Sequence, residues 1–152
     1  MKRLLLASLT VAMLLGGWRL ARGLFADDEA AVRAAIEDMR RAAEARDVGR
    51  FSGHISSGYR DDSNHNAMII KNMVGRVLGS LESVRVRVED LEVIVTGDTA
   101  YATMSVTTEA IKRGAIIHPF GSDQSPERPR VTFQKEGDDW KVIKVDNVQG
   151  GY

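Results

Sequence analysis

The segment from residue 84 to residue 148 constrains the fold most, because apolar and polar residues alternate along four successive stretches of it. The first stretch begins Val84-Arg85-Val86-Arg87-Val88, the period-two pattern of a strand with one face in water. The alternation changes phase near Glu89-Asp90, which predicts a β-bulge and a bend in a long strand. Gly-Asp turns at 97–98 and 137–138 close two hairpins. The pattern therefore predicts a curved antiparallel sheet whose concave apolar face must be covered.

Helical segments before this sheet supply the cover that it needs. Residues 27–46 begin with three acids, which favour a helix N-terminus, and apolar side chains then recur at helical spacing. Asp47 is predicted to cap a short second helix, and Ser63 or Asn64 a third helix. Residues 112–130 are predicted to form a long connection between strands. The predicted class is α+β: a curved antiparallel sheet packed on an N-terminal helix and two shorter helices.

The N-terminus predicts a targeting or anchoring helix that is separate from this domain. Two basic residues precede an apolar run without charge from Leu4 to Trp18. About 15 residues of helix span roughly 22 Å, and continuing to residue 21 brings the segment closer to a hydrocarbon core of about 30 Å. We expect residues 1–26 to be a signal anchor plus connector, with residues 4–21 in a membrane. A cleaved signal peptide is the alternative, and in both cases residues 27–152 form the domain.

The charge balance of the domain argues against nucleic acid as a partner. The chain has 21 basic and 21 acidic residues, and its first 26 residues hold four of the basic ones and no acid. The rest therefore carries 21 − 4 = 17 basic against 21 acidic residues, a net charge of −4. A nucleic-acid partner would need a basic face to neutralise its phosphates. The chain has no cysteine, which excludes disulfides, thiolate metal sites and a cysteine nucleophile.

The order of the predicted elements is similar to that of a known family. The residues that carry the resemblance are Val32, Ile36 and Met39, then Arg46-Asp47-Val48 with Phe51, Tyr59, Thr96-Gly97-Asp98-Thr99-Ala100, and Asp138-Asp139-Trp140-Lys141-Val142. In this order they resemble the nuclear transport factor 2-like superfamily, the cone-like α+β fold shared with ketosteroid isomerase and scytalone dehydratase. The resemblance covers about residues 27–148. It implies that the first helix lies across the concave sheet, with a pocket between sheet and helices and dimerisation through the outer sheet face. It implies no single reaction, because the fold hosts enzymes, binders and transport adaptors.

Enzymes with this cone place an acid or a base in it. Ketosteroid isomerase-like enzymes use a tyrosine on the first helix to hold an oxyanion, and this chain has no tyrosine between residues 27 and 46. An aspartate–histidine pair could be formed by Asp61 or Asp62 with His65 or His118. The alternative is that these aspartates make a polar turn before the third helix. The sequence therefore yields candidates for an acid–base pair and no established catalytic set.

Ligand-lining residues can be nominated only from residue type and position in the expected cone. The pocket candidates are Tyr59, Tyr101, Met73 and Met104, because tyrosine offers a donor and methionine is flexible and apolar. The histidines, His54, His65 and His118, do not have the spacing of metal ligands, so no metal site is predicted. No strand, glycine-rich turn and helix follow one another as in a phosphate-binding loop, and no cofactor is predicted.

These observations favour a non-catalytic, membrane-tethered binding or assembly module of unknown ligand. We expect it at a bacterial inner membrane with the domain facing the periplasm or the cell exterior, since basic residues near an apolar segment tend to stay cytoplasmic. A homodimer through the outer sheet face and a small apolar ligand are further expectations. The alternatives are a small isomerase, dehydratase or hydrolase with a pocket in the cone, and a carrier secreted after cleavage.

Overall fold

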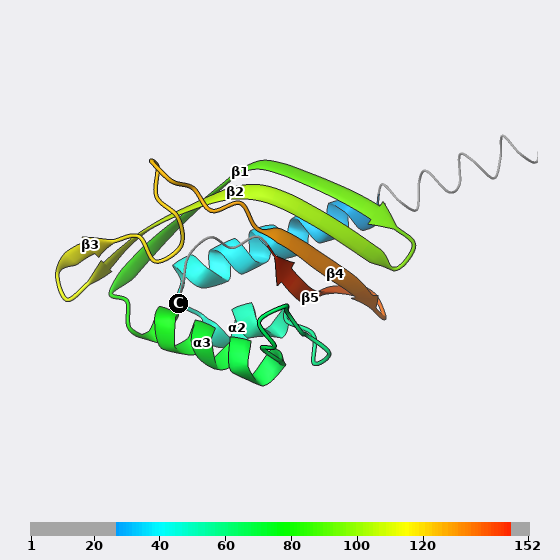
Figure 1. Cartoon of the computed structure of the whole chain (residues 1–152), viewed down its shortest axis with the longest axis horizontal. Helices are drawn as coiled ribbons and strands as arrows, with labels where there is room; N and C mark the ends of the chain where they lie inside the picture. The colour runs from blue at the N-terminus through cyan, green and yellow to red at the C-terminus, as the bar shows by residue number, and fades with distance from the viewer. Residues whose placement is uncertain (1–26, 147–152) are drawn as a thin grey trace, which may run out of the picture.

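A computed structural model describes residues 27–146, which form a curved sheet with helices on its concave side (Figure 1). The predicted anchor and connector, residues 1–26, and the last six residues of the predicted domain lie outside the described residues. Within residues 27–146, no helix is long and apolar enough to cross a membrane.

The sheet is antiparallel and follows the predicted hairpins. Its strands are β1 (Ser83–Thr96), β2 (Thr99–Lys112), β3 (Ala115–Ile117), β4 (Arg130–Glu136) and β5 (Asp139–Asp146). The spatial order is β1-β2-β4-β5, and β3 pairs with the far end of β2. The class predicted from the sequence is confirmed; β3, which lies in the predicted long connection, is an addition to it.

The predicted bulge lies in β1 and explains the change of phase. The register of β1 against β2 shifts between Glu89 and Glu92, and Asp90 adopts a φ of 53°. The extra residue turns the following side chains over, so Val88 and Leu91 both pack against the same core. The bulge therefore keeps one apolar face along the whole bent strand.

The connection between β3 and β4 is bound to β2 in the gap between the two short strand pairings. Val106 N–H donates to Glu127 O at 2.8 Å, and Glu127 N–H donates back to Val106 O at 3.0 Å. Thr108 N–H donates to Gly121 O at 3.1 Å, and the Thr108 hydroxyl and backbone of Phe120 exchange two further hydrogen bonds. This segment satisfies backbone groups of β2 that would otherwise form an open edge.

Three helical segments cover the concave side of the sheet. The first covers residues 27–44, and it is followed by α2 (Val48–Gly53) and α3 (Ala67–Gly79). The predicted cap of α2 is confirmed, since the Asp47 side chain accepts the Arg50 N–H at 2.9 Å.

The predicted start of α3 is wrong by two or three positions. The cap is Asn66, whose side chain accepts the Ile69 N–H at 3.0 Å, and not Ser63 or Asn64. Asn64 has a φ of 67° and donates its N–H to Asp61 O, so it belongs to a turn that precedes the helix. Ser63, Asn64 and Asn66 are all of residue types that cap helices, and because Asn64 lies in the preceding turn, Asn66 is the cap.

The first helix lies across the concave face, as predicted, and forms one core with the sheet (Figure 1). The buried residues of this core are Val32, Ile36, Ile55, Tyr59, Ala100, Ala102, Met104, Val106, Phe133, Trp140 and Val142. The helix is fixed at both ends by polar contacts. Asp28 accepts from Lys135 at 2.6 Å, Arg33 donates to Leu91 O at 3.1 Å, and Glu44 accepts the Val86 N–H at 3.0 Å. The last two contacts also cover part of the free edge of β1.

Candidate functional site

One predicted aspartate–histidine pair is formed, in the turn between α2 and α3. The Asp61 carboxylate lies 2.9 Å from His65 Nδ1 and accepts the His65 backbone N–H at 2.9 Å. The hydroxyl of Tyr59 donates to the same carboxylate at 3.3 Å. The side chain of Asp61 is largely buried and that of His65 is partly exposed. The ring of Tyr59 belongs to the core, so it holds the pair at a defined place.

The surroundings of Asp61 keep its carboxyl group ionised. Burial raises the pKa of Asp61, but the hydrogen bonds from the backbone and ring of His65 and from Tyr59 outweigh it, so the pKa is lowered. An ionised Asp61 that accepts from Nδ1–H leaves Nε2 of a neutral ring as the base. The pair therefore has the arrangement of a proton acceptor oriented by a carboxylate.

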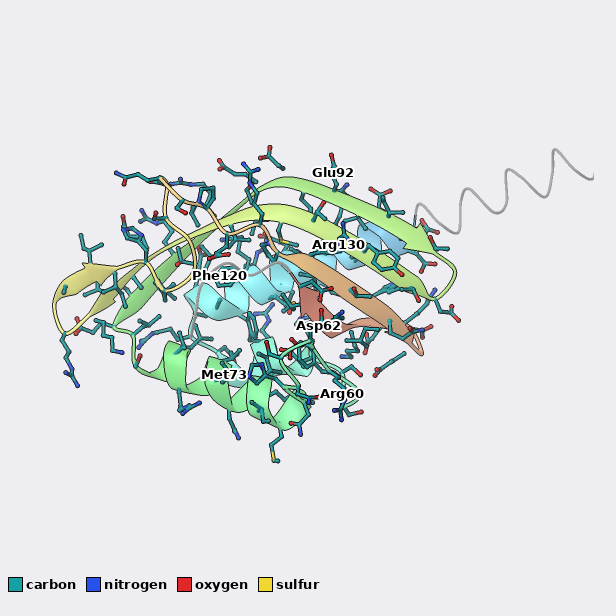
Figure 2. All side chains as sticks on the ribbon, in the orientation of Figure 1. Arg60, Asp62, Met73, Glu92, Phe120 and Arg130 are labelled. Atoms are coloured by element: carbon teal, nitrogen blue, oxygen red, sulfur yellow. The ribbon has the colours of Figure 1, made fainter. Side chains whose placement is uncertain are left out.

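The other two predicted acid–base candidates do not join this pair. Asp62 is exposed and forms an ion pair with Lys144 at 2.9 Å, and the Lys144 hydrogen bond lowers the pKa of the Asp62 carboxyl. His118 lies in the connection before β4, where its Nδ1 is 2.6 Å from Thr108 O. Figure 2 shows Asp62 on the turn before α3 and Phe120, a near neighbour of His118 in sequence, on that separate connection. Pairs that use Asp62 or His118 are therefore corrected to the single pair of Asp61 and His65.

A second aspartate–histidine pair, which the sequence did not predict, links the first helix to α2. Asp38 Oδ2 lies 2.8 Å from His54 Nε2, and both carboxylate oxygens of Asp38 are held by the guanidinium of Arg50. His54 is the C-cap of α2, and its backbone N–H donates into that helix. No local spacing joins residue 38 to residue 54, so only the packing of the two helices could reveal this pair.

The Asp38 cluster gives a pH-dependent prediction. The hydrogen bonds from Arg50 and then His54 lower the pKa of Asp38 from 3.8 to about 2. A lowered pKa in the folded state means that the stabilisation is present above pH 3.8 and is lost as the pH falls towards 2. Asp38→Asn should therefore lower the urea midpoint at neutral pH, and the difference from wild type should shrink through this range. Glu92→Gln, at an exposed carboxylate of β1, is the control and should show no such trend. A constant difference across the range would contradict the ion pair.

The four predicted pocket residues do not line one space. Tyr59 and Met104 are buried in the core, and Met73 is half-buried on α3. Tyr101 is 44% exposed and pairs across the ladder with Ile94, which is 64% exposed, so it lies on the outer face of the sheet. Its prediction as a pocket residue is wrong. The alternation along β2 already indicates that Tyr101 points outward, because Ala100 and Ala102 point inward and the residue between them must face the other way.

Two open hollows lie along the exposed side of α3. One has a volume of about 570 Å³ and is lined by Ser57, Asn66, Ala67, Met68, Lys71 and Asn72. The other has a volume of about 500 Å³ and is lined by Ile69, Asn72 and Arg76. Because both include Asn72, they adjoin along one helix face. Residues 27–146 contain no group of three or more histidine, aspartate or glutamate side chains that could hold a metal ion.

Comparison with known proteins supports the fold. The sequence matches no protein-family model and no curated protein. An NTF2-like protein with a cystatin-like fold from Novosphingobium aromaticivorans is 18% identical over 88% of this chain and 89% of its own, with a TM-score of 0.67. A candidate dehydratase of the NTF2-like family from Streptomyces avermitilis is 17% identical over 79% of this chain and 94% of its own, also with a TM-score of 0.67. Bd1075 of Bdellovibrio bacteriovorus is 14% identical over 76% of this chain, with a TM-score of 0.62, and this chain spans 39% of its length. At these identities the likeness establishes the fold and no activity.

Proposed function

We propose that this chain, whose domain has the nuclear transport factor 2-like cone fold, is a membrane-tethered extracytoplasmic binding or assembly module that uses its outer surface. The observation that carries the proposal is the packing of the cone. Val32 of the first helix, Phe133 of β4 and Val142 of β5 are the largest fully buried side chains, and they belong to the core between the first helix and the sheet, where the resemblance to the family implies a pocket. Two open hollows lie outside the cone, on α3.

Two further features support this assignment. The uncharged segment of residues 4–18 precedes the helix that begins the described domain, so a tether would enter directly at the cone. The outer face of the sheet carries the exposed pair of Ile94 and Tyr101, which is suited to contact with a second copy of the chain. The apolar segment supports the tether, and the exposed pair supports binding at the outer face of the sheet.

Fractionation of cells that produce the full-length chain tests the tether. The protein should stay in the membrane fraction after washes with high salt and alkaline carbonate, and mass spectrometry should find the Met1 end. Val11→Arg combined with Leu15→Arg should release it, because two charges within a short apolar segment oppose insertion. Ile94→Arg with Ile116→Arg, two exposed positions of the domain, is the matched control and should leave it bound. Release of the wild type by carbonate would contradict the anchor, and a shortened N-terminus would favour the secreted carrier.

A small enzyme is the second candidate, and the Tyr59–Asp61–His65 chain of hydrogen bonds favours it. His65 could act as a general base towards a ligand that reaches the turn before α3. A panel of apolar esters and secondary alcohols would be screened for turnover with the wild type. Any turnover should be lost in His65→Gln and kept in His54→Gln, which alters the other aspartate-paired histidine. Equal loss in both variants, or no turnover at all, would remove this candidate.

A further inference from the structure

We draw no further inference here: the strongest candidate, the surface patch on the outer face of the sheet where the exposed side chains of Ile94 and Tyr101 adjoin a row of Glu92, Thr103 and Arg130, only restates the contact with a second copy that the resemblance to the family already implies.

Discussion

Gly121→Ala is expected to lower the free energy of unfolding by roughly 3 kcal/mol or more, which can unfold a domain of this size. Gly121 has a φ of +70°, and a Cβ there would lie 2.4 Å from Val106 O and 2.6 Å from Glu127 N. Both atoms are backbone and belong to the hydrogen bonds that attach the connection to β2. The connection cannot move away without breaking those bonds, so both backbone strain and the clash contribute.

Gly114→Ala is the matched control for the strain alone. Gly114 has a φ of +75°, but a Cβ there meets no atom within 4 Å. It should cost only about 1–2 kcal/mol, the penalty of the left-handed conformation. Urea unfolding followed by circular dichroism gives both values. If the two variants lost the same free energy of unfolding, the connection would be able to move away from β2 at little cost. That result would contradict its role as a segment bound to the edge of β2.

Phe133→Ala is expected to lower the free energy of unfolding by about 3–5 kcal/mol, because it removes a large side chain from a packed interior. Phe133 is 0% exposed, faces Ala100 of β2 across the ladder, and belongs to the same core as the first helix. Small neighbours such as Ala100 cannot fill the space that the ring leaves, so a cavity should remain.

Ile94→Ala, at the exposed outer face, is the control and should change the unfolding free energy by less than about 0.5 kcal/mol. The same urea titrations measure both variants. A loss below about 1.5 kcal/mol for Phe133→Ala would mean that the interior of the cone is loosely filled. That result would weaken the proposal of an outer-surface module and would favour a ligand inside the cone.

The sequence was most informative where structure depends on short-range periodicity. Alternation along β1 predicted the bulge between Glu89 and Glu92, because a strand whose alternation changes phase needs an extra residue to keep its apolar side chains on one face. The same reasoning predicted the turns at 97–98 and 137–138 and the stripe of the first helix. Alternation along β2 also indicates that Tyr101 points outward, so the prediction of Tyr101 as a pocket residue was wrong.

The pattern of residues was therefore enough to predict the elements other than β3, their apolar faces and their order, because each apolar residue that must be buried marks the inner face of its helix or strand. Three contacts became visible only in the folded domain: Asp38 contacts His54, Asp61 pairs with His65 and not His118, and the backbone of Glu127 and Gly121 binds the open side of β2. These contacts join residues in loops or on separate helices. Their separation in sequence does not follow the period of a helix or a strand, so no sequence pattern predicts them. Their geometry follows from how the packed elements bring the intervening turns together, and the candidate site and exposed face of α3 depend on that packing.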